Sequence, residues 1–284
     1  MGYYIRSAHN QFSMMSSRVS MTEAFQSPNL NDIQKQKILL TEKARVFAFE
    51  KLKLNKTDNY NSFIDLKRPY VTWVVHAAEK WQMKNYEWKY PIVGAMPYKG
   101  FFTEAEAKAE ADEMQKLGFD TYVRGVSAYS TLGWFTDSLL SSMLRYKDHD
   151  LVNTIIHEIT HTTIYIKNNS DFNERLAVFI GNKGAEMFYK ELEGPDSTTL
   201  KLIAEENEDD RLFSEFISKE LTDLEKWYLE NPDSALKNED ARSARLNVIH
   251  DHFEKDLAPR LKTTVYAKFT KEKMNNARMG LYKT

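Results

Sequence analysis

The sequence predicts an α+β fold, in which a small mixed β-sheet packs on a site-bearing helix and a large helical part follows. The N-terminal region has helical periodicity, the middle holds short β-branched and aromatic runs, and the residues after about 150 are almost entirely helical in pattern. Strands that precede a run of helices, instead of alternating with them, are typical of α+β proteins. We expect one unit over residues 1–284, with possible sub-lobes at 1–149 and 150–284.

The elements of the first half follow from local patterns. Apolar stripes broken by Ser27-Pro28-Asn29 predict two helices, and the polar stretch after them predicts a loop. Thr103 and Glu106 form a capping box that begins a further helix, which Gly118 ends. The expected helices are 9–25, 31–52 and 103–117, the loop is 55–61, and the strands are 70–75, 90–94, 98–102 and 120–126.

The second half is predicted to be helical. Asp137 or Ser138 is expected to cap a short helix that ends at Arg145, and Gly194-Pro195 ends one of the longer helices. The many Glu and Lys residues of the last two helices are typical of solvated faces. The expected long helices are 150–167, 172–191, 197–230 and 233–256.

Composition excludes several classes of site. The 284 residues include no cysteine, so disulfides, iron–sulfur clusters and thiolate zinc sites are excluded, and any metal must be bound by histidine and carboxylate. The net charge of −2 gives no bulk attraction to nucleic acid or anionic lipid. No run reaches the length of a transmembrane segment.

The pentapeptide His157-Glu158-Ile159-Thr160-His161 is the most specific motif of the chain. Histidines four residues apart project from one side of a helix, where both imidazoles can bind one tetrahedral zinc ion. Glu158 can then act as general base on a metal-activated water. The alternative is a surface His/Glu pair on an ordinary helix, but the apolar pattern around the motif favours a buried helix.

A catalytic zinc site needs a third protein ligand and an open fourth position. Glu174, in Asn173-Glu174-Arg175-Leu176-Ala177, begins the next apolar-periodic run after a turn-like spacer. Two histidines and one glutamate form a known catalytic zinc set, so we predict His157, His161 and Glu174 as the ligands of Zn²⁺.

These motifs resemble the gluzincin branch of zinc metallopeptidases, and more fully the bacterial family described as putative or predicted aminopeptidases. The resemblance extends over nearly the whole chain in order, and its longest block is Tyr-Ser-Thr-Leu-Gly-Trp-Phe at residues 129–135. Its other matching segments are 3–4, 68–70, 98–102, 157–161, 173–177 and 274–278.

The resemblance implies a zincin-like fold and a zinc-dependent peptidase with peptide substrates. It also implies an exported lipoprotein whose signal and lipid anchor precede this chain, and hence a periplasmic or envelope location; a cytoplasmic location is the alternative. In related aminopeptidases a Gly-x-Met-Glu-Asn stretch binds the substrate amino terminus. Here Pro97 and Tyr98 replace its Glu and Asn after Gly94-Ala95-Met96, which leaves exopeptidase and endopeptidase activity both open.

Three further residues are candidates for substrate binding. Tyr129 can line the cleft or donate to the oxyanion, or it can be a packed turn aromatic. Asn275 and Asn276 can line the cleft or cap a helix. Two other functions stay open, namely a non-catalytic envelope protein that uses a peptidase fold, and a zinc hydrolase of a non-peptide amide. An intact Glu158 argues against the first of these.

Overall fold

A computed structural model describes residues 12–90, 94–128, 136–231 and 238–283. Its contacts divide the chain into two compact units that alternate along the sequence, the first formed by 1–71 and 126–203 and the second by 72–125 and 204–284. This division differs from the predicted sub-lobes 1–149 and 150–284. The chain leaves the first unit after residue 71, returns at 126 and leaves again after 203, and no break in composition marks these points.

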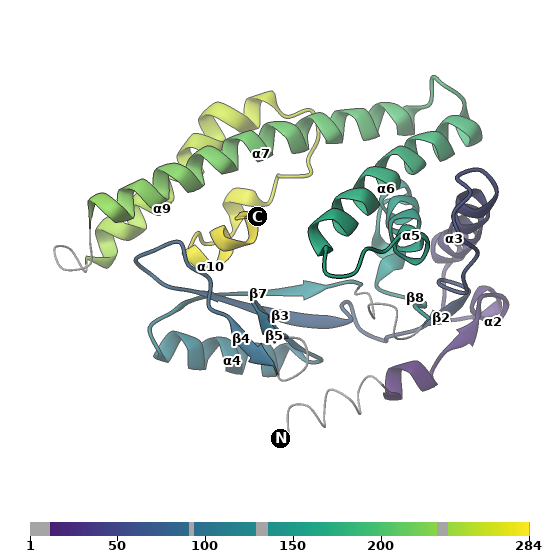
Figure 1. The fold of residues 1–284 in the computed structure, drawn as a ribbon, viewed down its shortest axis with the longest axis horizontal. Coiled ribbons are helices and arrows are strands. Elements are labelled where there is room, and N and C mark those ends of the chain that lie inside the picture. Colours follow the sequence, from purple (N-terminus) through teal and green to yellow (C-terminus); the bar gives the residue numbers. More distant parts are fainter. Residues whose placement is uncertain (1–11, 91–93, 129–135, 232–237, 284) are drawn as a thin grey trace. The chain divides into compact units, whose positions relative to one another are not determined.

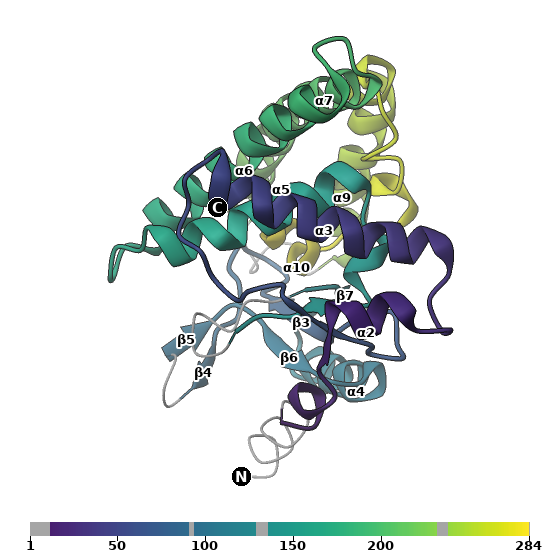
Figure 2. The same cartoon turned by 90° about the vertical axis from the view of Figure 1, so that its right-hand side faces the viewer.

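The first unit consists of helices and a small sheet (Figure 1). Its sheet has the order β1-β2-β8, where β1 (Val19–Ser20) is antiparallel and β8 (Leu139–Leu140) is parallel to the central β2 (Ser62–Ile64). Helix α5 packs against both α3 and α6, as Figure 2 shows. The helices of this unit are α2 (Met21–Gln26), α3 (Asp32–Glu50), α5 (Asp148–Thr163) and α6 (Ser170–Glu193).

Two local predictions for this unit have different outcomes. The sequence predicted that Asn31 or Asp32 starts α3, and in the structure Asn31 is the N-cap residue, in a reciprocal capping box with Gln34. The short helix expected from Asp137 or Ser138 to Arg145 is wrong. Leu139 and Leu140 instead pair with β2 and are buried, and only Met143–Arg145 forms a 3₁₀ turn. A strand partner more than seventy residues away decides this segment, and local capping patterns cannot reveal it.

The second unit contains a three-stranded sheet in the order β6-β3-β7, covered on one face by α4 (Figures 1 and 2). The strands β4 and β5 form an antiparallel hairpin beside it. Helix α7 (Thr198–Glu230) enters this unit after Ile203 and packs on α9 through a shared apolar cluster. The other elements are β3 (Thr72–Ala78), β4 (Trp88–Tyr90), β5 (Gly94–Met96), β6 (Lys99–Phe101), α4 (Glu104–Lys116), β7 (Asp120–Val126), α9 (Glu239–His252) and α10 (Asn276–Met279).

Among the helices of the described residues, none combines the length and the apolar character that crossing a bilayer requires.

A buried ion pair joins distant parts of the second unit. Arg242 of α9 donates to both oxygens of Asp120, at 2.7 and 3.1 Å, and each side chain is less than a tenth exposed. The same carboxylate accepts the backbone N–H of Asn276 at 2.9 Å. One carboxylate at the start of β7 therefore fixes both α9 and the N-terminus of α10.

We expect Asp120→Ala to lower the free energy of unfolding by about 3–5 kcal/mol, because it leaves the Arg242 guanidinium without the buried carboxylate that it pairs with. Glu239 is the control, since it pairs with the same guanidinium through a side chain that is 52% exposed. Its replacement by alanine should cost about 0–1 kcal/mol. Urea unfolding of both variants measures the difference, and equal losses would contradict the assignment.

Candidate metal centre

Helix α5, in the first unit, carries both motif histidines on the same side. Its apolar face is wholly buried and holds the helix against the core, so the polar side is the one that can carry a site. His157 and His161 are one turn apart on that side, and their Nε2 atoms lie 3.2 Å from each other. The buried residues of the apolar face are Leu151, Val152, Ile155, Ile156 and Ile159.

Glu174, in the first turns of α6, brings a carboxylate to the same point. Its Oε2 lies 3.5 Å from His157 Nε2, and its Oε1 lies 3.4 Å from His161 Nε2. Ligands that bind a tetrahedral zinc at about 2.0–2.1 Å lie about 3.4 Å from one another. Each of the three measured distances is therefore close to the separation of two neighbouring ligands of one such ion, and one donor atom from each residue lies within 4.8 Å of the other two. The Glu174 side chain is 63% exposed, so solvent reaches this group of donors.

Two glycines let α6 approach α5 this closely. A Cβ at Gly181 would lie 3.2 Å from the Cβ of His157 and 2.5 Å from Oδ1 of Asn153. A Cβ at Gly184 would lie 2.9 Å from both the Ile156 and Leu52 side chains. Neither site has room for a side chain unless the neighbours move. The spacing of these glycines on α6 was the available sequence signal for close helix packing, and the sequence analysis missed it.

Burial changes the proton affinity of two groups at this centre. Loss of solvation, reinforced by the carboxylates of Asp137 and Glu174, raises the pKa of Glu158 to about 7. Loss of solvation, followed by the influence of His161, lowers the pKa of His157 and so favours the neutral imidazole that metals bind. A carboxyl group whose pKa lies near neutrality can both accept and return a proton.

Tyr60 is a neighbour of Glu158 that the sequence analysis did not single out. Its phenol is buried, and the desolvation, with the negative charges of Glu158 and Asp137, raises its pKa well above the ordinary value. Its backbone has a φ of 58°, unusual for an aromatic residue, and its N–H donates to the Asp137 carbonyl at 2.7 Å. The segment 55–61, which the sequence predicted only as a polar loop, therefore carries a buried tyrosine whose pKa is raised in part by the charge of Glu158, the candidate general base.

Of the three predicted substrate-binding residues, two have contacts that the structure describes. Tyr129 lies outside the described residues. Asn275 caps α10 by accepting the Arg278 N–H at 2.9 Å and donates to the Thr121 carbonyl. Asn276 is fully buried, accepts from the Tyr228 hydroxyl at 2.7 Å and donates to carbonyls of the loop after β3. Both asparagines have structural contacts within the second unit, and a role in substrate binding stays a prediction.

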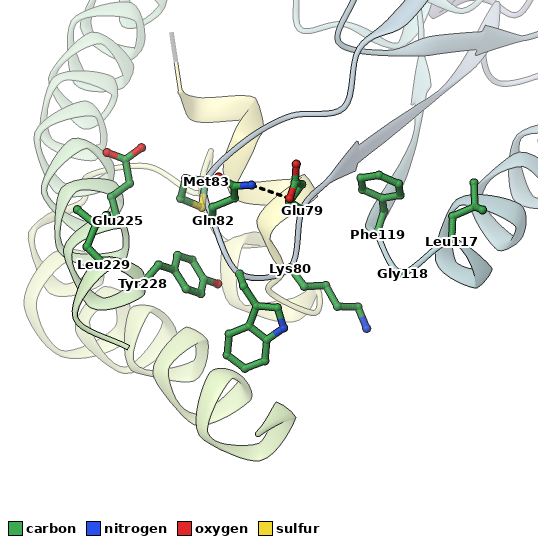
Figure 3. A pocket seen from close by; sticks show the side chains of 11 residues that line it. Glu79, Lys80, Gln82, Met83, Leu117, Gly118, Phe119, Glu225, Tyr228 and Leu229 are labelled. Carbon is green, nitrogen blue, oxygen red and sulfur yellow. Dashed lines mark hydrogen bonds between the residues drawn. The ribbon is translucent and has the colours of Figure 1, made fainter. Parts of the chain in front are cut away.

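A cavity of about 870 Å³ lies within the second unit (Figure 3). Its wall combines apolar side chains with Glu79, Lys80 and Glu225, and Figure 3 shows Glu79 bonded to Gln82. None of the predicted site residues lines it, so it gives no support to the chemistry of the metal centre. The apolar and aromatic lining residues are Trp81, Met83, Leu117, Phe119, Tyr228 and Leu229.

A family model described as "Putative aminopeptidase" matches residues 2–284. The chain belongs to this putative aminopeptidase family. The family predicted from the sequence is therefore confirmed, and its name suggests a hydrolase that removes residues from peptide amino termini. No curated protein and no solved structure matches the chain. Membership of the aminopeptidase family does not specify a metal, so the gluzincin assignment stays a prediction.

Proposed function

We propose that the protein is a zinc-dependent peptidase in which His157, His161 and Glu174 bind the metal and Glu158 is the general base. The observation that carries this proposal is the close grouping of donor atoms from three residues: the two Nε2 atoms lie 3.2 Å apart, Glu174 Oε2 lies 3.5 Å from that of His157, and Glu174 Oε1 lies 3.4 Å from that of His161. Two imidazoles and a carboxylate form a donor set typical of catalytic zinc. Membership of a family named for aminopeptidase activity supports the choice of peptides as substrates.

A zinc ion at this centre would supply a Lewis acid that makes a water molecule more acidic and polarises a carbonyl. Glu158 follows His157 in the chain but is not one of the three donors, so its carboxylate is available for proton transfer. It accepts the proton of the attacking water and then passes this proton to the leaving amine. The partly buried position of Glu158 keeps bulk water from competing for that proton.

We expect peptidase activity to disappear when the purified protein is treated with a metal chelator, and to return when Zn²⁺ is added back. A panel of fluorogenic peptides with free and blocked amino termini measures this activity. Cleavage of free amino termini alone indicates an aminopeptidase, and cleavage of blocked peptides indicates an endopeptidase. Chelator-resistant cleavage, or no cleavage of any peptide, would contradict the proposed function.

A further inference from the structure

Asn173 makes an unusual pair of hydrogen bonds beside the proposed ligand Glu174. Its side chain is nearly inaccessible, with an exposure of 3% for the residue. Its Oδ1 accepts the N–H of Ile166 at 2.9 Å, and its Nδ2 donates to the carbonyl of the same Ile166 at 2.8 Å. The amide side chain thus pairs with Ile166 as a peptide group of a neighbouring strand would.

This pair of bonds closes the connection between α5 and α6. Ile164 is the C-cap residue of α5 and has an extended backbone, and Ile166 lies two residues further along. Asn169, the N-cap residue of α6, makes no capping hydrogen bond with its side chain. The ordinary device that fixes the start of a helix is therefore missing, and the Asn173 side chain ties the first turn of α6 to the preceding loop instead.

The Glu174 carboxylate itself has little else to hold it. Within the described ranges its ion-pair contacts are with the two imidazoles, and its side chain is 63% exposed. An exposed glutamate samples several rotamers, so its fit to the histidines depends on where the backbone of α6 begins. Gly181 fixes the separation of the two helices about two turns further along α6, and Asn173 fixes the first turn.

We propose that Asn173 is a positioning residue of the metal centre, which holds the Glu174 carboxylate opposite the His157–His161 pair by clamping the backbone of Ile166. This inference rests on the proposed function. The expected effect of Asn173 is on metal affinity. A carboxylate that is already held in place loses less conformational freedom when it binds the metal.

The test compares Asn173→Ala with Asn169→Ala, a control in the same connection whose side chain makes no cap bond. Zinc affinity is measured by competition with a chromophoric chelator. We expect Asn173→Ala to bind zinc about 10–100-fold more weakly, as loss of an outer-shell partner typically does, and Asn169→Ala to bind as the wild type does. After replacement of zinc by Co²⁺, the visible d–d spectrum of Asn173→Ala should differ from that of the wild type, because water replaces Glu174 as a ligand.

Thermal unfolding of the metal-free proteins shows whether a variant is folded. If Asn173→Ala does not fold, Asn173→Ser carries the test, since its shorter hydroxyl cannot reach both groups of Ile166. Wild-type zinc affinity and an unchanged cobalt spectrum in a folded Asn173 variant would overturn the positioning role and leave the proposed function intact. Failure of the wild type to bind zinc would overturn both.

Discussion

Glu158→Gln is expected to lower kcat by about 10²–10⁴-fold, the usual contribution of a positioned general base, while the zinc content stays that of the wild type. Glutamine preserves the size of the side chain but cannot accept the proton of the attacking water. The pKa of Glu158, raised to about 7 by burial, shows that the negative charge is costly at this position. A neutral amide should therefore be tolerated without loss of fold.

The measurement combines kcat on a fluorogenic peptide with the zinc content of the same sample after dialysis. Asp171→Asn is the matched control, because Asp171 is an exposed carboxylate in the first turn of the ligand-bearing helix and is not among the proposed donors. It should keep wild-type activity. A Glu158→Gln variant that retains the wild-type kcat would remove Glu158 from the mechanism.

The parts of the candidate site that depend on short-range geometry could be predicted from the sequence. His157 and His161 needed only the 3.6-residue period of one helix, and the apolar residues around them showed which face is buried. The carboxylate of Glu174 was predicted from its motif and from the need for a third ligand. In the structure one donor atom from each of these residues lies within 4.8 Å of the other two, and their role as metal ligands stays a proposal.

The means by which the carboxylate reaches the histidines could not be predicted in the same way. Gly181 and Gly184 have ordinary backbone conformations, and their importance lies in what a side chain would meet on another helix. Asn173 was noted as part of a motif, yet its bonds go to a loop residue seven positions earlier. Both features depend on packing between elements, which periodicity within one element does not describe.

The fold also contains contacts that local sequence patterns do not predict, and these join residues that lie far apart in the chain. Strand β7 was predicted at its observed residues, because a run of β-branched and aromatic residues is a local pattern. The pairing of Asp120 with Arg242 spans 122 positions, and it joins a strand to a helix in a unit that the chain enters twice. The residues around Asp120 and those around Arg242 carry no local pattern that pairs them. The sub-lobes were therefore predicted from the order of strands and helices along the chain.

Glu174→Ala is expected to weaken zinc binding by more than the roughly 10–100-fold cost of losing an outer-shell partner, because it removes a proposed ligand itself. The two imidazoles that remain are neutral donors, so the site also loses its only anionic ligand among the three proposed. Zinc should be lost on dialysis and peptidase activity with it. Glu186→Ala is the control on the same helix, since that carboxylate pairs with Lys183 at the surface.

The comparison of Glu174→Ala with Glu158→Gln separates the two roles that the structure suggests for neighbouring carboxylates. Both variants should be inactive, but only the first should lack zinc, because Glu158 is not one of the three donors that lie within 4.8 Å of each other. Excess zinc should restore part of the activity of Glu174→Ala and none of that of Glu158→Gln. Unchanged zinc content in dialysed Glu174→Ala would exclude Glu174 as a ligand and would contradict the proposed three-residue metal site.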